Sequence, residues 1–283
     1  MADQHAEAEA LVGGSDAVER TRDFAARHYS DDARLNARIA LHKRFGEGSA
    51  NWYDWVFERM HLPKAARILE IGAGTGELWA AHKTALGPQM RLVLSDLSDG
   101  MLASARQRLQ AAGIDAEYVQ ADACELPFER DSFDVVIANH MLYHVGNRRT
   151  ALEEIDRVLK TGGTVYAATN GRRHMAELIE LQRRYELPYN LGFALAKALF
   201  SLENGGGQLA ALFPHVEMHR YPARLRVTEV EPLIDYLTSL DDQPENRTSS
   251  YAALRQAVQA QIEREGAVEI QKDTGLFIAR KHG

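Results

Sequence analysis

Short hydrophobic runs alternate with helical stretches through the middle of the chain. Five runs are typical of strands: residues 67–72, 91–96, 116–121, 133–139 and 164–169. The segments between them repeat apolar residues at helical spacing. Continuous apolar strands that alternate with helices indicate a parallel sheet covered on both faces, and right-handed crossovers make such a sheet doubly wound. The pattern therefore predicts an α/β fold.

Helical segments flank this region on both sides. Residues from about 16 to 60 follow a helical pattern, and residues from about 171 to 213 are helical again. Because the later segment interrupts a run of strands, we expect it to lie above the strand ends as a lid. The expected domains are an N-terminal helical cap at residues 1–62 and a Rossmann-like domain at 63–283, with the lid inserted at about 171–213.

The last third of the chain is expected to complete the sheet. Residues 216–227 are strand-like, and two helices follow at about 228–240 and 250–265. Residues 268–279 are typical of a hairpin that turns at Asp273-Thr-Gly275. We therefore expect a doubly wound, mostly parallel, seven-stranded Rossmann-like sheet.

Composition narrows the class of partner. The formal net charge is −7 over 283 residues, and an acidic surface argues against nucleic acid as the main partner. A single cysteine, Cys124, excludes an intramolecular disulfide and fits a reducing compartment. No apolar stretch is long enough to span a bilayer, and the first residues lack the pattern of a signal peptide. We therefore expect a cytoplasmic protein that binds neither nucleic acid nor membrane.

Alternating glycines end the first predicted strand, in the sequence Glu70-Ile-Gly72-Ala-Gly74-Thr-Gly76. They remove the side chains that would keep a ligand from lying across the strand end. A dinucleotide fingerprint needs a glycine where Glu77 stands, and a phosphate-binding loop needs a lysine that does not follow here. The spacing therefore favours a different ligand, and a tight turn without any ligand is the alternative.

Acidic residues follow the second and third predicted strands. Asp96 closes the second strand, where a carboxylate can accept both hydroxyl hydrogens of a ribose, although it also suits a helix N-cap. Asp122 follows the third strand, where it can accept a hydrogen bond from an adenine amino group while the Ala123 N–H meets a ring nitrogen. A solvated turn is the alternative for Asp122.

These positions together resemble the class I S-adenosylmethionine-dependent methyltransferases. The resemblance covers about residues 64–170 and adds further motifs: Ser-Asp-Leu-Ser at 95–98, Leu-Pro-Phe at 126–128, Ser-Phe-Asp-Val-Val at 132–136 and Arg-Val-Leu-Lys-Thr-Gly-Gly at 157–163. Thr161 departs from the family, which usually has proline there. The resemblance implies that the cofactor is S-adenosyl-L-methionine and that the chain transfers its methyl group to a small molecule.

The resemblance also implies roles for individual residues. The turn after the first strand would line the methionine and ribose portion of the cofactor, Asp96 would hold the ribose, and Asn139 would lie near the sulfonium. Leu97 and Met101 would pack on the adenine. The implied cofactor-binding residues are Glu70, Gly72, Ala73, Gly74, Gly76, Asp96, Leu97, Met101, Asp122, Ala123 and Asn139.

Two histidines after the fourth strand, His140 and His144, are the candidates for catalysis. A sulfonium is already an activated electrophile, so a base is needed only when the nucleophile carries a weakly acidic proton. His140 is the better candidate for that base, and a packed ring is the alternative for His144. Their spacing also suits a metal pair, but no further Glu or His stands nearby, so we predict no metal site.

The same run bears on the acceptor. Family members that methylate planar amide or adenine nitrogens carry Asn-Pro-Pro-Tyr here, whereas this chain has Asn-His-Met-Leu at 139–142. Oxygen, carbon, sulfur or ordinary amine acceptors are therefore preferred. Aromatic residues of the flanking helices, among them Trp52, Tyr53 and Tyr185, suggest an apolar or aromatic acceptor, although aromatics at helical spacing also build cores. The oligomeric state is open, with a homodimer as one option.

Two other functions stay open on this evidence. An NAD-dependent oxidoreductase shares the predicted fold, and Glu77 in the glycine spacing argues against it. A non-catalytic S-adenosylmethionine-binding regulatory protein would keep the cofactor site and lack an acceptor pocket.

Overall fold

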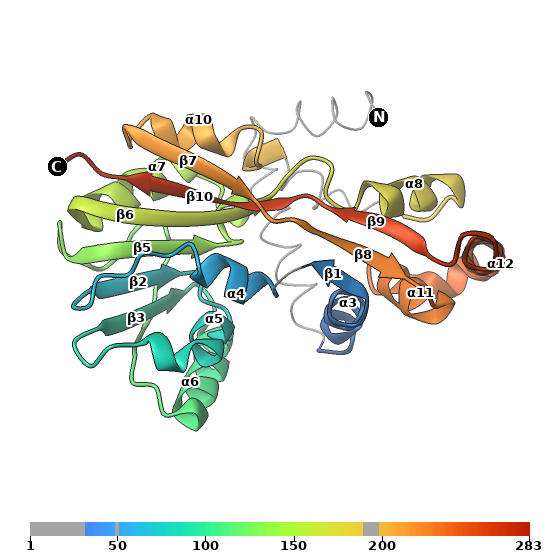
Figure 1. Ribbon diagram of the computed structural model, residues 1–283, viewed down its shortest axis with the longest axis horizontal. Helices are drawn as coiled ribbons and strands as arrows, with labels where there is room; N and C mark the ends of the chain where they lie inside the picture. Colours follow the sequence, from blue (N-terminus) through green and yellow to red (C-terminus); the bar gives the residue numbers. More distant parts are fainter. Residues whose placement is uncertain (1–31, 49–50, 189–197) are drawn as a thin grey trace. The chain divides into compact units, whose positions relative to one another are not determined.

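The computed structural model describes residues 32–48, 51–188 and 198–283 (Figure 1). Contacts divide the chain into two units. The one called here the sheet unit takes in the described parts of 50–171, 199–221 and 274–283; the accessory unit takes in those of 1–49, 172–198 and 222–273.

Seven strands form the sheet of the sheet unit, in the order β4-β3-β2-β5-β6-β10-β7. Neighbours from β4 to β6 pair in parallel, and β10 runs antiparallel to both β6 and β7. The predicted doubly wound, mostly parallel, seven-stranded sheet is therefore confirmed. Its strands are β2 (Arg67–Ile71), β3 (Arg91–Asp96), β4 (Glu117–Gln120), β5 (Phe133–Asn139), β6 (Leu159–Asn170), β7 (His215–Arg220) and β10 (Thr274–Arg280).

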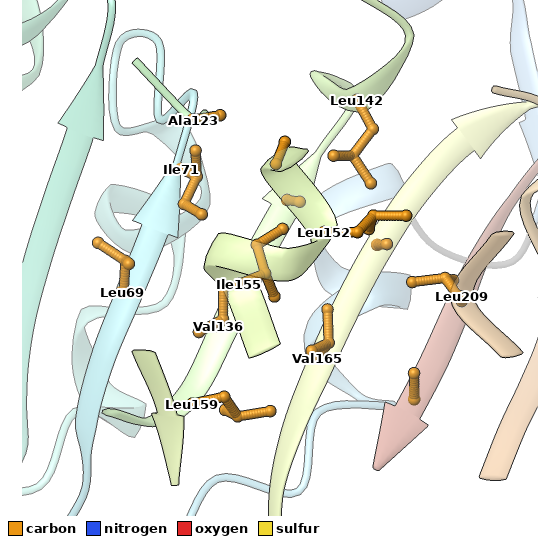
Figure 2. Packing of buried hydrophobic residues seen from close by; sticks show 14 of the residues in the cluster. Leu69, Ile71, Ala123, Val136, Leu142, Leu152, Ile155, Leu159, Val165 and Leu209 are labelled. Carbon is orange, nitrogen blue, oxygen red and sulfur yellow. The ribbon is translucent and has the colours of Figure 1, made fainter. Parts of the chain in front are cut away.

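Helices cover this sheet on both faces. Side chains alternate along a strand, so Leu69 of β2 and Val165 of β6 share one face, where they pack on Leu152 of α7 and Leu209 of α10 (Figure 2). The other face carries α5 and α6 (Figure 1). The helices of this unit are α4 (Trp52–Phe57), α5 (Glu77–Ala81), α6 (Asp99–Ala112), α7 (Arg148–Val158) and α10 (Gly205–Ala210), with the 3-10 turns η1 (Lys83–Ala85) and η2 (Leu142–His144).

The accessory unit has a small antiparallel sheet of its own, in the order β1-β8-β9. Its core joins Leu41 and Phe45 of α3 to Leu225 of β8, Leu233 of α11 and Leu254 of α12. The sequence did not predict this second sheet. The elements are α3 (Asp32–Phe45), β1 (Gly46–Gly48), α8 (Ala176–Arg184), β8 (Ala223–Val227), α11 (Val230–Thr238), η3 (Pro244–Arg247), α12 (Thr248–Glu265) and β9 (Val268–Lys272).

The predicted hairpin at residues 268–279 is wrong. Both strands exist, but β9 pairs with β8, whereas β10 pairs with β6 and β7. The burial of the two strands explains the difference: β9 is alternately buried and exposed, as in a sheet with one open face, whereas β10 is buried along most of its length. The strand-like segment at 216–227 likewise divides into β7 and β8, which belong to different sheets.

The two units differ in their limits from the expected domains. Residues 51–62 belong to the sheet unit, and the segment at 171–213 is shared between both units. A lid role for that segment stays a prediction, and residues 189–197 within it lie outside the described residues. Among the described helices, none combines the length and hydrophobicity needed to cross a membrane.

Candidate functional site

The chain reverses its direction through the sheet between β2 and β5. From β2 it moves outward to β3 and β4, then returns to β5 on the other side of β2 and continues to β6. In open parallel sheets, ligands bind beyond the carboxyl ends of the strands at such a point. Gly72 follows the last residue of β2 and His140 follows the last residue of β5. The fold therefore brings the predicted glycine turn and the histidine segment to one edge of the sheet.

The glycine turn has a left-handed backbone. Gly72, Gly74 and Gly76 have φ values of 64°, 55° and 70°, which residues with a Cβ rarely adopt. The Ala73 N–H donates to the Ser95 carbonyl over 3.0 Å, and the Gly76 N–H donates to the Ala73 carbonyl over 3.0 Å. Because these bonds tie the turn to the end of β3, its shape is set by the backbone.

The glycines serve different purposes. A Cβ added at Gly76 would lie 2.6 Å from Cδ1 of Leu109, so this glycine lets α6 pack closely. A Cβ at Gly72 would lie 2.6 Å from that of Met141, which covers this side of the turn. At Gly74 no described atom lies within 4 Å of the added Cβ. The open part of the turn is therefore at Gly74.

Asp96 reaches this open part of the turn. Its Oδ2 accepts the Gly74 N–H at 2.9 Å, and its Oδ1 accepts the Ser98 N–H at 2.9 Å. The helix cap is made by Ser98 instead, whose Oγ accepts the Met101 N–H at 3.3 Å. Each carboxylate oxygen can accept a second hydrogen bond. Asp96 therefore retains capacity for two further donors beside Gly74.

An exposed apolar side chain stands next to Asp96. Leu97 exposes 54% of its surface, the larger of two such values among the large hydrophobic side chains of the described residues. The Gln120 Nε2 donates to the Leu97 carbonyl at 3.0 Å, which braces this position against β4. Met101 is half-buried at the start of α6. An apolar ring lying on Leu97 would remove this surface from water.

Asp122 shapes its own turn. Its Oδ1 accepts the Cys124 N–H at 2.9 Å, and Asp122 forms an isolated bridge with Glu125. Ala123 is buried in the core beneath the turn. These bonds agree with the turn interpretation, and a role for Asp122 and Ala123 in reading an adenine edge stays a prediction.

Glu70 is a buried carboxyl group directly before the turn. Its Oε2 accepts the Trp79 Nε1–H at 2.6 Å. Burial raises the pKa of Glu70 to about 8, against the opposing effect of the Trp79 hydrogen bond and with a contribution from the charge of Asp96. Burial, together with the charges of Glu77 and Glu70, also raises the pKa of Tyr53 to about 12. The interior next to the turn therefore favours the protonated, uncharged forms of both groups.

Asn139 presents an unsatisfied acceptor at the end of β5. Its Oδ1 is buried and has no hydrogen-bond partner among residues 32–48, 51–188 and 198–283. Buried polar atoms without partners are rare in proteins, and each one calls for an explanation. A donor or a positively charged group on a bound ligand would satisfy this oxygen.

The two histidines lie in different environments. His140 has a φ of 57°, and its N–H donates to the Ala168 carbonyl at 3.1 Å. His144 ends η2, where its ring meets that of Tyr143 at 4.4 Å, and burial lowers the pKa of His144 to about 4. At neutral pH His144 is therefore uncharged and weakly basic, which agrees with the packed-ring alternative.

Some residues around the site were not predicted for it. Met141 covers Gly72, Trp79 holds Glu70, and the Tyr221 ring packs edge-on against that of Trp52 at 5.3 Å. The signal available for Tyr221 was its place within the strand-like segment at 216–227, directly before Pro222. Within the described part of the chain, no group of three or more His, Cys, Asp or Glu residues could hold a metal ion.

Comparison with known proteins agrees with this geometry. Residues 69–167 match the methyltransferase domain family. The chain carries a class I S-adenosylmethionine-dependent methyltransferase domain. The chain is similar to the ubiquinone/menaquinone biosynthesis C-methyltransferase UbiE of Idiomarina loihiensis. The two are 37% identical over 116 residues, a match that covers 40% of this chain and 46% of that protein. The match to UbiE of Coxiella burnetii is 32% identical over 150 residues and covers 52% of this chain and 60% of that protein.

Solved structures share the fold of this methyltransferase domain. YcgJ of Bacillus subtilis superposes with a TM-score of 0.54 at 18% identity, over 82% of this chain and 98% of that one. A second solved structure is a phosphoethanolamine N-methyltransferase of Haemonchus contortus in complex with phosphomonomethylethanolamine and S-adenosylhomocysteine. It superposes with a TM-score of 0.54 at 21% identity, over 93% of this chain and 60% of that one. The chain spans about half the length of the curated relatives it matches.

Proposed function

We propose that this chain transfers a methyl group from S-adenosyl-L-methionine to a small-molecule acceptor. The observation that carries the proposal is the Asp96 carboxylate bonded to the Gly74 N–H, at the one glycine of this turn whose outer side is open. A ribose placed there would give its two hydroxyl hydrogens to the unused lone pairs of Asp96.

The surrounding residues fit the rest of the cofactor. Leu97 would lie under the adenine, because its exposed surface adjoins the ribose carboxylate. The Asn139 Oδ1, which has no hydrogen-bond partner among the described residues, would face the positively charged methionine end, and the buried Glu70 carboxyl group would lie directly before the turn that lines it. Ala73 and the glycines of the turn would leave room for the part of the cofactor between these ends. Each group would thereby meet the part of the cofactor whose chemistry it complements.

The cofactor supplies an electrophilic methyl group when bound. The protein's part is to align the acceptor with that group and to exclude water. His140, at the end of β5, is the residue we assign to removing a proton from the acceptor where one must leave. His144 is the weaker candidate because its lowered pKa leaves it a poor base at neutral pH.

The acceptor we propose is apolar or aromatic, with an oxygen, carbon, sulfur or ordinary amine as the atom methylated. The Trp52 ring lies beside His140 and is backed by the rings of Trp55 and Tyr221, which supports a flat, uncharged acceptor. The named relatives methylate carbon in one case and nitrogen in the other, so they do not favour one atom.

The test is isothermal titration with S-adenosylhomocysteine. Micromolar binding to the wild type is expected, and no binding at high micromolar ligand would rule out the proposal. Asp96→Ala should weaken binding by about 1–3 kcal/mol, because partners of the lost carboxylate are left unmatched. Asp99→Ala, which removes an exposed acid three residues later, is the matched control and should bind as the wild type does.

The alternatives predict different titrations. An NAD-dependent oxidoreductase would bind NADH and not S-adenosylhomocysteine. A non-catalytic binding protein would bind S-adenosylhomocysteine, yet a screen of flat apolar compounds would yield no product heavier by one methylene.

A further inference from the structure

A cluster of aromatic rings adjoins His140 within the sheet unit. The Trp52 ring lies 4.9 Å from the His140 imidazole, between centroids, at an interplanar angle of 51°. On its other sides Trp52 stacks on Trp55 at 5.6 Å and meets Tyr221 edge-on at 5.3 Å. Trp55 in turn meets Tyr221 at 5.3 Å and lies under the Arg59 guanidinium at 4.0 Å. Trp52 is therefore held from several sides while one side faces His140.

The backbone of His140 is fixed, but its ring is not fixed by the backbone. The left-handed φ of 57° and the bond from its N–H to Ala168 set the direction in which the side chain leaves. This conformation costs free energy in a residue other than glycine, and residues that adopt it are concentrated at functional sites. Rotation about the two side-chain bonds of His140 remains, and the neighbouring rings that contact the imidazole limit it. Trp52 supplies one such wall, and Tyr143 meets the imidazole at 6.2 Å on another.

Helix α4, which carries Trp52, is anchored to α5. The His82 Nε2 lies 3.0 Å from Oδ1 of Asp54 on α4, and its Nδ1 lies 2.8 Å from the Leu78 carbonyl on α5. Phe57 of α4 stacks flat on His82 at 4.3 Å. Because Gly76 is the N-cap of α5, the same pair of helices links the glycine turn to the ring of Trp52 beside His140.

We propose that Trp52 is a positioning residue for His140 and forms the acceptor-side wall of the site. It holds the imidazole in one rotamer and offers a flat apolar surface to the acceptor. The role in turnover depends on the proposed methyl transfer, whereas the placement of the imidazole does not. Trp52 would therefore act on His140 without touching the cofactor.

Nuclear magnetic resonance tests the placement without an acceptor. In the wild type with labelled histidine and tryptophan, we expect nuclear Overhauser contacts between the ring protons of Trp52 and His140. Trp52→Leu should move and broaden the His140 ring resonances, and Trp52→Phe should restore a single sharp set. Tyr118→Leu is the control: it removes a half-buried ring from β4, which lies three strands from β5 in the sheet, and should leave those resonances unchanged.

Turnover gives a second measurement once an acceptor is found. Trp52→Leu should lower kcat on the order of 10- to 100-fold, the size of loss that a misplaced group causes, and Trp52→Phe should recover most of it. Unchanged S-adenosylhomocysteine affinity in both variants is expected.

The outcomes separate this proposal from the proposed function. Absence of the Trp52–His140 contacts in the wild type, or unchanged His140 resonances in Trp52→Leu, overturns the positioning role and leaves methyl transfer standing. If Trp52→Leu does not fold, the wild-type contacts still decide. Failure of the wild type to bind S-adenosylhomocysteine overturns the proposed function, whatever the contacts show.

Discussion

The two halves of the candidate site are held in place by different means. The turn after β2 is tied by backbone hydrogen bonds, and its carboxylate, Asp96, is fixed by the N–H groups of Gly74 and Ser98. The segment after β5 is bound to the neighbouring strand through the His140 N–H, and local bonds such as that from the His144 N–H to the Met141 carbonyl shape the rest of it. The ring of His140 depends on contacts with side chains such as Trp52, which lies 88 residues earlier in the chain.

This difference indicates which changes each half tolerates. A backbone-held turn should be sensitive to any added Cβ and keep its shape without a ligand. A half positioned by packed rings should fold with many substitutions but lose its geometry when a neighbouring ring is removed. The following predictions test that contrast.

The largest effect is expected at His140. His140→Asn keeps a residue that tolerates the left-handed backbone and removes the imidazole. For an acceptor whose proton must be removed, turnover should fall about 10²- to 10⁴-fold, or about 3–5 kcal/mol in activation free energy.

Two comparisons check this assignment. His144→Asn should cost less turnover, because burial already lowers the pKa of His144 to about 4 and leaves it weakly basic. S-adenosylhomocysteine affinity, measured by titration calorimetry, should stay within error for His140→Asn. An equal loss in both histidine variants would contradict the assignment of the base to His140.

The next effect concerns the stability of the glycine turn. Gly76→Ala should lower the free energy of unfolding by about 2–4 kcal/mol, because strain at φ 70° adds to a contact of 2.6 Å with Leu109. Gly162→Ala is the control, since Gly162 has a φ of 76° and no described atom within 4 Å of the added Cβ. Gly162→Ala should lower the free energy of unfolding only by the cost of backbone strain, about 1–2 kcal/mol, as measured by urea unfolding. Equal losses would mean that α6 does not pack on the turn as closely as described.

The smallest effect is a pH dependence due to Glu70. Its pKa is about 8 in the folded chain and 4.5 ordinarily. Between these values the unfolded chain has lost a proton that the folded chain keeps, so stability falls as pH rises from about 4.5 to about 8. Below and above that window the two states carry the same charge at this group.

Glu70→Gln removes this dependence while keeping an acceptor for Trp79. Its stability relative to the wild type should rise by about 1–3 kcal/mol from pH 5 to pH 8, measured by urea unfolding at each pH. The exposed Glu77, changed to Gln, is the control and should show no such rise. A Glu70→Gln difference that is flat with pH would place the carboxylate in its charged form throughout.

Much of the fold was predictable from local pattern. The strands β2, β3 and β5 were predicted within one residue of their observed ends, because each is a short apolar run ended by glycine or a polar residue. The final strands were found but wrongly paired, since apolar runs specify that a strand forms and not which strand lies beside it. The three-stranded sheet of the accessory unit was missed for the same reason: β1 has three residues and pairs with β8, far away in the chain.

What the sequence alone determined is the glycine turn after β2 and the carboxylate beside it. Left-handed turns need glycine, and a carboxylate at a strand end acts on backbone groups beside it, so both can be read from neighbouring residues. The tertiary structure alone decided which side chains cover that turn, how deeply each histidine is buried, and that Trp52 and Tyr221 meet near His140. Those contacts join residues distant in the chain, and burial is a property of the packed molecule rather than of any segment of it.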